Sequence, residues 1–341
     1  MDARGIAGHA FRMEAFPNRF AGMPLVSKLC SSPQLEARLR AEAPSADILH
    51  AHGLWLMSNI YPLRAAGRAG KPCIASPHGM LSPEALKVSP ARKRLFWRLF
   101  QGQAMHAADC LHATSDAEYA DLRALGLSQP VAIVPNGVDL PPLGETDKGG
   151  ARILLFVGRL HPIKGLDSLV EAWARLERQH PDWVLRIAGP APTGYGEDLK
   201  RKAARLGCTR IEFPGALAGD GKDAAYRGAD LYVQPSLSEN FSLTVAEALS
   251  HGAPVVASRG TPWSGLETHR CGWWVDHGAE PLFQALDRAM RLPRGELEQM
   301  GRRGRQWMAR DFAAESVALR ILAVYRWLID GGEPPADVRV T

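Results

Sequence analysis

Short apolar runs alternate with longer segments of helical periodicity along almost the whole chain. Such runs are typical of buried strands, and the segments between them are long enough to be helices that connect the strands. This alternation predicts an α/β protein with parallel sheets. In the first half, the predicted strands are Ile48–Ala51, Cys73–Ser76, Cys110–Thr114 and Val131–Val134.

The second half repeats the alternation. The predicted strands there are Ile153–Val157, Val184–Ala188, Ile211–Phe213, Leu231–Gln234 and Val255–Ala257. A helix is predicted over Leu166–Gln179, directly after the first of these strands. Two or three helices are expected to close the chain, the last of them over Glu315–Asp330, where apolar residues recur at helical spacing.

The two halves meet at a polar segment from Leu140 to Gly150 that is rich in proline and glycine, as linkers are. We therefore predict one domain over residues 1–141, a linker over 142–150 and a second domain over 151–311. A doubly wound domain normally opens with a buried strand and a glycine-rich turn. Residues 1–30 contain no convincing buried strand. The first domain is thus expected to be truncated at its start.

Composition narrows the class of protein. Apolar residues make up 46% and charged residues 23% of the 341 positions, which is typical of soluble globular proteins. The five cysteines are widely spaced and form no CxxC pair, which favours a reducing cytoplasm over a disulfide framework or a zinc site. The net charge of +5 is concentrated in the first 140 residues. Such a surface attracts anionic lipid, nucleic acid or phosphorylated substrates, but no nucleic-acid-binding motif accompanies it.

The strongest chemical signal is the stretch that follows the predicted strand Leu231–Gln234. A helix is predicted to begin near Ser242, a good N-cap residue, and to end at Gly252. The N-terminus of a helix at the carboxyl end of a strand favours phosphate. Glu239 and Glu247 beside such a site are suited to accept hydrogen bonds from ribose or hexose hydroxyls. Alternatively, Glu239 caps the helix and Glu247 is a solvated surface charge.

Two further loops follow predicted strands. After Ile153–Val157, the loop from Gly158 to Gly165 carries Arg159, suited to bidentate phosphate contact, and Lys164, a point charge. The alternative is a basic loop with its side chains in water. His78 follows the strand Cys73–Ser76 and precedes a glycine that allows close approach of a ligand. A lone histidine is more often structural, and His52 has the same local context with a weaker claim.

These segments together resemble the family 4 retaining glycosyltransferases, which have the GT-B fold. The resemblance rests on GRL…KG from Gly158, on SENFSLTVAEAL as an E-x7-E motif, and on GAPVVAS after it. In the first half, DILHAHGLW, PHGML, HATSDAE and VPNGVD are similar to members that build bacterial surface polysaccharides. The resemblance implies two Rossmann-like domains facing a cleft, with a terminal helix over 312–330 packed back on the first domain.

The resemblance also implies roles for matching residues. Arg159 and Lys164 would hold the donor diphosphate and stabilise the leaving group, and Glu247 would hold the ribose hydroxyls. Glu239 and His78 would contact the transferred sugar from opposite domains. The donor-binding set is completed by Gly158, Asn240 and the backbone amides of Phe241, Ser242 and Leu243. The family generally needs no metal, and the chain has no DxD motif. The nucleotide sugar is a substrate, so no cofactor is expected.

The segment Ala91–Phe100 interleaves basic and aromatic residues on a predicted helix. Such a helix can lie on an anionic membrane surface. Equally, its Phe and Leu residues can fill the core while its Arg residues are solvated. Because many members of the resembled family use polyprenyl-linked acceptors, we expect the protein in the cytoplasm, in contact with the cytoplasmic face of the inner membrane.

The sequence thus predicts a retaining, metal-independent hexosyltransferase that uses a nucleotide-diphospho-sugar donor and a glycan or polyprenyl-linked acceptor in exopolysaccharide or lipopolysaccharide assembly. Two alternatives stay open. One is a truncated, non-catalytic remnant that binds a nucleotide sugar, and the other is a GT-B epimerase, which the GRL…KG loop disfavours. GDP-mannose, UDP-glucose and UDP-N-acetylglucosamine all remain possible donors.

Overall fold

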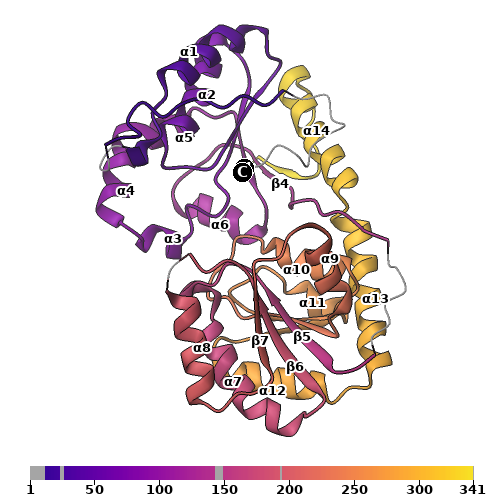
Figure 1. The fold of residues 1–341 in the computed structure, drawn as a ribbon. Helices are drawn as coiled ribbons and strands as arrows, with labels where there is room; N and C mark the ends of the chain where they lie inside the picture. Colours follow the sequence, from indigo (N-terminus) through magenta and orange to yellow (C-terminus); the bar gives the residue numbers. More distant parts are fainter. Residues whose placement is uncertain (1–11, 24–26, 143–148, 193, 341) are drawn as a thin grey trace.

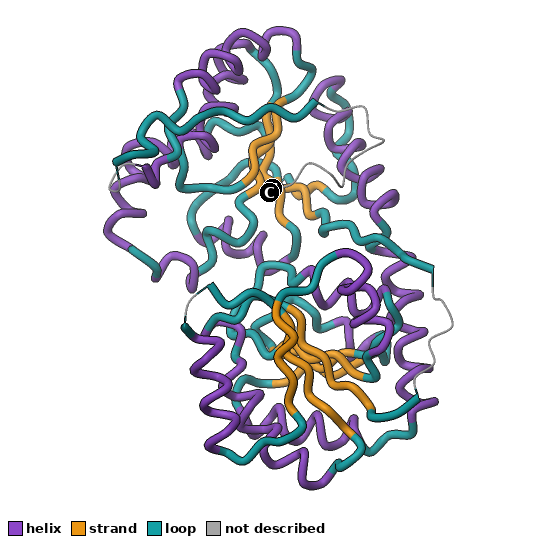
Figure 2. Tube along the Cα trace, in the orientation of Figure 1, coloured by secondary structure: helices purple, strands orange, loops and turns teal. Residues whose placement is uncertain are grey.

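The chain folds into two lobes, each built on one mainly parallel sheet with helices on both of its faces (Figures 1 and 2). The computed structural model describes residues 12–23, 27–142, 149–192 and 194–340. The predicted α/β class is confirmed. The predicted linker over 142–150 lies mostly outside the described residues, because 143–148 are not among them.

The first sheet has the strand order β1-β2-β3-β4-β11. Its four parallel strands are β1 Leu49–His52, β2 Cys73–Ser76, β3 Cys110–Ala113 and β4 Val131–Ile133. The short β11, Val338–Arg339, pairs antiparallel with β4 and was not predicted, because two residues carry no periodicity. The helices are α1 Pro33–Glu42, α2 Met57–Ala69, α3 Pro83–Lys87, α4 Pro90–Phe96, α5 Gly102–His106 and α6 Asp116–Ala124.

The second sheet is entirely parallel and has the order β10-β9-β8-β5-β6-β7. Its strands are β5 Arg152–Val157, β6 Trp183–Ala188, β7 Ile211–Gly215, β8 Leu231–Gln234, β9 Val255–Ser258 and β10 Gly272–Val275. Sequence analysis predicted all of these except β10. The helices are α7 Leu166–Gln179, α8 Tyr195–Arg205, α9 Gly219–Gly228, α10 Leu243–Ser250, α11 Gly265–Thr268, α12 Ala279–Met290, α13 Arg294–Asp311 and α14 Ala314–Asp330.

The central strand β5 shows how the second sheet is buried on both faces. Leu154 and Phe156 belong to the core under α7, α8 and α12, whereas Leu155 and Val157 belong to the core under α9, α10 and α13. Alternate side chains of a strand point to opposite faces, so β5 needs an unbroken apolar run. Its position in the middle of the sheet places the loop after it at the centre of the sheet's carboxyl edge.

The end of the chain returns to the first lobe. Helix α13 ends at Asp311, and α14 crosses from the second lobe to the first along one side of the molecule (Figure 1). At the crossing, Val138 donates to the Phe312 carbonyl at 2.8 Å and accepts from the Ala314 N–H at 3.0 Å. Val317 and Val324 of α14 then pack on the first sheet against a cluster that includes Ile74, Cys110 and Val134.

Candidate active site

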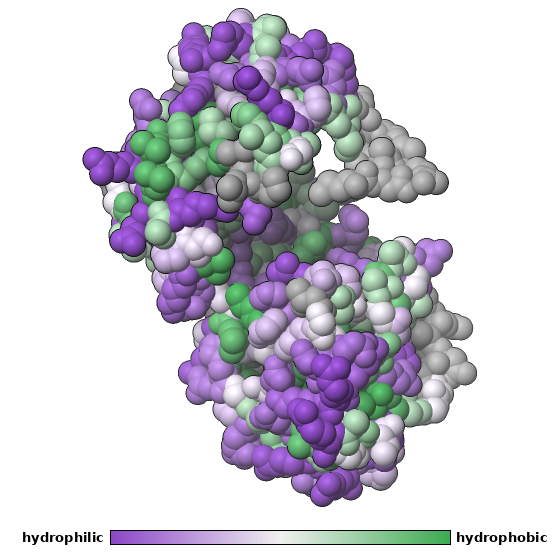
Figure 3. Space-filling view, turned by 60° about the vertical axis from the view of Figure 1, so that its left-hand side comes forward, coloured by the Kyte–Doolittle hydropathy of each residue, from purple (hydrophilic) through white to green (hydrophobic). Residues whose placement is uncertain are grey.

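The carboxyl edges of the two sheets face each other across a hollow between the lobes (Figure 3). In the second lobe, the loops after β5 and β8 are in direct contact. The N–H of Leu237 donates to the Ile163 carbonyl at 2.8 Å. Gly165 has a φ of +67°, and a Cβ there would lie 2.1 Å from the carbonyl oxygen of Pro235. Only glycine allows this approach, so the two loops act as one unit.

Lys164 and Glu239 form an ion pair at the junction of these loops. The Lys164 Nζ lies 2.5 Å from Glu239 Oε1, and the side chains are only 19% and 13% exposed. Glu239 also accepts hydrogen bonds from Gln234 Nε2 at 3.0 Å and Ser236 Oγ at 2.7 Å. The alternative in which Glu239 caps the helix is therefore wrong. Its charge is held by three side-chain donors beneath the cleft.

Arg159 differs from Lys164 in having no partner among the residues that the structure describes. It is exposed at the end of β5, and it makes no hydrogen bond or ion pair with any of the residues that the structure describes. A guanidinium free of an internal partner keeps its donors for a ligand. Within the described part of the chain, the loop after β5 thus presents Arg159 as a free cation and Lys164 as one neutralised by Glu239.

Helix α10 begins where it was predicted, but Ser242 does not cap it as expected. Ser242 occupies the N-cap position with a φ of +63°, and its side chain makes no capping hydrogen bond. In this left-handed conformation the hydroxyl lies 3.5 Å from Thr244 Oγ1 instead. The first N–H groups of a helix have no acceptor within the helix, so the start of α10 stays available to an anion. Leu243, the first helical residue, is exposed.

Glu247 lies one and a half turns into α10 and points toward α9. It accepts from Lys222 Nζ at 2.6 Å and from the Tyr226 hydroxyl at 2.8 Å. Burial raises the pKa of Tyr226, so this phenol stays protonated and donates. Glu247 is therefore not the solvated surface charge of the alternative interpretation. It lines a small cavity together with Leu243 and the segment around Val138.

The facing edge of the first lobe is rich in histidine. His78 follows β2 with a φ of +53°, and its Nε2 lies 2.9 Å from Nδ1 of His52. The His52 ring is stacked between His78, at a centroid distance of 5.2 Å, and His50, at 4.1 Å. His112 of β3 stands edge-on to both His50 and His78. Sequence analysis singled out only His78 and His52.

The hydrogen bonds of this cluster have a fixed direction. His112 Nε2 lies 2.8 Å from the Val134 carbonyl, which can only accept, so this nitrogen carries a proton. In a neutral His112, Nδ1 then accepts from Ser76 Oγ at 2.8 Å. Ser76 Oγ in turn accepts from His50 Nε2 at 2.6 Å. The other nitrogen of His50 must accept from the Tyr325 hydroxyl of α14, also at 2.6 Å.

The environment of the cluster keeps the imidazoles of His50, His52 and His112 neutral. Burial lowers the pKa of His50 to about 3, with further lowering by His52 and His112. Burial also lowers the pKa of His52 and of His112, and nearby histidines add to the effect in both cases. Because desolvation disfavours the charged form, the first edge offers neutral donors and acceptors where the second edge offers charges.

The two lobes touch directly between these edges. Asn240, predicted as a donor-binding residue, donates from Nδ2 to Thr114 Oγ1 at 2.8 Å. A Cβ at Gly79 would lie 2.6 Å from the Cβ of Asn240. Glu118 supports this contact, because its carboxylate accepts from the N–H groups of Gly79 and Thr114. Glu118 was not predicted as a site residue, since its contact with Gly79 joins positions 39 residues apart in the chain.

The described part of the chain holds no group of three or more His, Cys, Asp or Glu side chains arranged to bind a metal ion. None of its helices combines the length and the apolar character that a bilayer crossing requires.

Two parallel-sheet α/β lobes with facing carboxyl edges and a terminal helix that returns to the first lobe define the GT-B class of glycosyltransferases. Family descriptions agree with this class. "Glycosyl transferases group 1" matches residues 144–307, and "Glycosyl transferase 4-like domain" matches residues 1–137. The chain belongs to family 4 of the glycosyltransferases. The second match begins at residue 1, so it gives no support to the expected truncation of the first domain.

Related proteins cover most of the chain. A D-inositol 3-phosphate glycosyltransferase of Kribbella flavida is 32% identical over 89% of this chain and 76% of its own length. One from Segniliparus rotundus is 30% identical over 90% and 72%. Among solved structures, Anabaena Alr3699/HepE in complex with UDP and glucose superposes with a TM-score of 0.71, at 19% identity over 91% of this chain and 84% of that one. Sucrose-phosphate synthase from Thermosynechococcus elongatus has a TM-score of 0.68, at 22% identity over 87% and 78%.

Proposed function

We propose that this glycosyltransferase transfers a hexose from a nucleotide-diphospho-sugar to a glycan or polyprenyl-linked acceptor, with retention of configuration and without a metal ion. The observation that carries the proposal is Arg159, which is unpaired among the described residues and follows β5, beside the Lys164–Glu239 ion pair at the edge where β5 and β8 end. A departing diphosphate needs positive charge where its own negative charge develops. The start of α10 adds N–H groups on the same side.

In this proposal, the bond between the anomeric carbon and the diphosphate oxygen breaks while Arg159 and Lys164 hold the phosphates. The acceptor hydroxyl attacks the same face of the sugar, and its proton passes to the departing phosphate oxygen. Glu239 contacts the sugar hydroxyls, and Glu247 contacts the ribose. Gly158, Asn240 and the amides of Phe241, Ser242 and Leu243 complete the donor contacts. His78 approaches the sugar from the first lobe.

The donor class is supported by neighbours that were solved with UDP and with UDP-glucose. Assembly of exopolysaccharide or lipopolysaccharide is supported only by the first-half motifs. The test is to incubate the protein with UDP-glucose, GDP-mannose or UDP-N-acetylglucosamine, with and without EDTA, and to follow release of the nucleoside diphosphate and the anomeric configuration of the product by NMR. Inversion, or a requirement for metal, would contradict the mechanism. Binding without turnover would favour the non-catalytic remnant.

We also propose that the first lobe contacts an anionic membrane surface, which would place the enzyme at the cytoplasmic face of the inner membrane. The segment Ala91–Phe100 forms α4 and the start of a π-helical turn over Trp97–Gln101. Phe96 is buried, but Leu95 and Leu99 are 59% and 53% exposed, and the neighbouring Arg92, Arg94 and Arg98 are exposed too. Exposed leucines beside Arg92, Arg94 and Arg98 favour interfacial binding over a purely structural role.

This proposal predicts sedimentation with vesicles that contain phosphatidylglycerol but not with vesicles of phosphatidylcholine alone. Binding should weaken as salt rises, because exposed charges are screened. Replacing Arg92, Arg94 and Arg98 by Gln should release the protein, whereas replacing Arg201 and Lys200 of α8 in the second lobe should not. Equal sedimentation with both kinds of vesicle would refute an electrostatic contact.

A further inference from the structure

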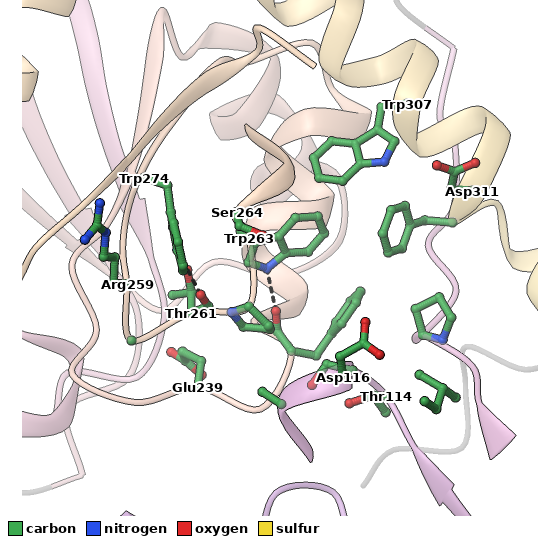
Figure 4. Close-up of a pocket in the computed structure, with 18 of the residues that line it drawn as sticks. Thr114, Asp116, Glu239, Arg259, Thr261, Trp263, Ser264, Trp274, Trp307 and Asp311 are labelled. Atoms are coloured by element: carbon green, nitrogen blue, oxygen red, sulfur yellow. Dashed lines mark hydrogen bonds between the residues drawn. The ribbon is translucent and has the colours of Figure 1, made fainter. Parts of the chain in front are cut away.

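A cavity of about 940 Å³ opens between the lobes on the side of β9 and β10. Its walls come from the loop after β9, from the end of α13 and from the first-lobe loop around Thr114 (Figure 4). Glu239 lines it, but as far as the described residues show, Arg159, Lys164 and His78 do not. A concave site between domains is the usual position of a ligand pocket, and of the proposed donor contacts Glu239 and Phe241 border this one.

Aromatic rings form one wall of the cavity, and they are fixed in place before any ligand binds. Trp263 donates its indole N–H to the Phe241 carbonyl, and Trp274 donates to the Thr261 carbonyl at 3.0 Å (Figure 4). Trp263 lies edge-on to Trp307 at a centroid distance of 5.5 Å. Because their N–H groups are already satisfied, Trp263 and Trp274 offer the cavity ring surface rather than hydrogen bonds.

The charges of the cavity are paired with one another or with nearby residues. Arg310 forms two hydrogen bonds with the neighbouring Asp311, at 2.7 and 2.8 Å. Arg320 is bound by both oxygens of Asp337, at 3.0 and 2.6 Å. Arg259, over the ring of Trp274, lies 3.2 Å from Asp276. A phosphorylated ligand would have to compete with these carboxylates, so the cavity does not favour an anion.

Ring faces beside paired polar groups suit a neutral saccharide. The C–H groups of a pyranose face pack on the electron-rich face of an aromatic ring, and its hydroxyls can bond to the charged groups at the rim without displacing their partners. Trp274 is the half-buried ring that remains accessible, whereas Trp263 and Trp307 are buried.

The cavity is also connected to the reaction site. The N–H of Glu239 donates to the Gly260 carbonyl at 2.7 Å. A Cβ at Gly260 would lie 2.4 Å from the carbonyl oxygen of Ser236. The cavity wall therefore supports the loop that carries Glu239, and a ligand in the cavity lies beside that loop.

We propose that this cavity binds a neutral saccharide, stacked on Trp274, and that the saccharide is the already assembled part of the glycan acceptor. The assignment to the acceptor rests on the proposed function, whereas saccharide binding by itself does not. The cavity is formed by both lobes, so an acceptor that fills it binds to the closed arrangement in which Asn240 meets Thr114.

Saturation-transfer difference NMR with maltohexaose, cellohexaose and chitohexaose tests this assignment. At least one of the three should receive saturation from the wild-type protein. Trp274→Ala should weaken that saccharide's binding by about tenfold, as expected for loss of a central aromatic contact. Because Trp274→Ala could disturb folding, Ser264→Trp provides a second variant, since Ser264 is exposed and lines the cavity, so that a bulky ring there would block it.

Saturating UDP and the Arg159→Ala variant should both leave the saccharide signal unchanged, because neither acts on the cavity. The proposal is overturned if none of the three saccharides receives saturation, if both cavity variants bind as the wild type does, or if UDP or Arg159→Ala abolishes the signal. That last result would put the sugar in the donor site. Nucleotide binding and donor turnover are measured separately, so failure of the proposed function would be seen independently.

Discussion

The two edges that face each other across the hollow use opposite electrostatics. In the second lobe, charged groups are retained and paired, as in the Lys164–Glu239 and Lys222–Glu247 contacts. In the first lobe, buried imidazoles are held neutral and linked in a chain from Tyr325 to Val134. Burial disfavours charged side chains on both edges. On the second lobe, ion pairing keeps the side chains charged, whereas on the first lobe the pKa values of the buried histidines are lowered.

This electrostatic difference between the two edges affects how the leaving group is stabilised in the proposed reaction. A diphosphate that departs toward Arg159 is stabilised only if the opposite lobe does not compete for it. Neutral histidines can position a sugar through hydrogen bonds without attracting the phosphates. The electrostatic attraction for the diphosphate then comes from the second lobe. The following predictions test whether the two edges differ in this way.

The largest effect is expected at the Lys164–Glu239 pair. Lys164→Met leaves the Glu239 charge poorly compensated in a site where both side chains are mostly buried, and it should lower the free energy of unfolding by about 3 kcal/mol. Urea denaturation followed by tryptophan fluorescence measures this. The double variant Lys164→Met, Glu239→Gln should be less destabilised than the two single losses combined, because neither charge is left alone. Additive losses would show that the pair is not coupled.

Arg159 should affect binding instead of stability, because it has no partner within the described residues to lose. Arg159→Ala should weaken UDP or GDP binding by roughly 1.5–3 kcal/mol, the range for a charge-assisted contact. Calorimetry on the folded variant measures this, and Arg201→Ala, whose side chain is 64% exposed on α8, is the matched control. Unchanged affinity for both nucleotides would remove Arg159 from the site.

The charged edge could be read from the sequence, because its residues lie close together along the chain. Arg159 and Lys164 lie in one loop, and Glu239 and Glu247 lie in one strand–helix unit. The loop and the unit each include or follow an apolar run from which the strand was predicted correctly. The spacing of residues along the chain could not predict that Lys164 and Glu239 form an ion pair with each other. That contact depends on β5 and β8 being neighbours in the sheet, which is a property of topology rather than of local pattern.

The neutral edge was mostly missed, for the same reason. Its hydrogen bonds join β1, β2, β3 and α14, and Tyr325 is 275 residues away from His50. No local pattern links these positions.

Ser242 was misjudged because the preference of serine for N-caps assumes an extended backbone, whereas Ser242 is left-handed here. The strand β10 was missed because Trp273 and Trp274 are both only partly buried, so no clear alternation marks it.

The neutral edge predicts that the protein loses stability in mild acid. His50 has a folded-state pKa of about 3, while an unfolded histidine titrates near 6.5. Between these values the unfolded chain binds more protons, so stability is full above about pH 6.5 and falls as pH decreases toward 3. From pH 7 to 5.5 the loss should be on the order of 1–2 kcal/mol, with His52 and His112 acting in the same direction.

Urea midpoints at several pH values measure this slope. His50→Asn should flatten it, whereas His106→Gln should not, since His106 is exposed on α5. A slope that is unchanged in the His50 variant would show that the imidazole is charged or solvated in the native protein, and the contrast between the two edges would then be lost.

The smallest and most specific effect concerns the direction of the hydrogen-bond chain. If the Tyr325 hydroxyl donates to His50 Nδ1, Tyr325→Phe removes the donor and leaves an imidazole acceptor without a partner, at a cost of about 1 kcal/mol. The remaining bonds keep their direction, because the carbonyl of Val134 still requires a proton on His112 Nε2. Nitrogen-15 NMR of the histidine rings should therefore show the Nε2–H tautomer for His50 and His112 in the wild type and in the variant.

An Nδ1–H tautomer for His50 in the wild type would mean that this nitrogen donates to Tyr325. Ser76 must then donate to His50 and cannot also donate to His112. The chain would then break at Ser76, and α14 would be hydrogen-bonded to His50 alone, without a connection through Ser76 to His112.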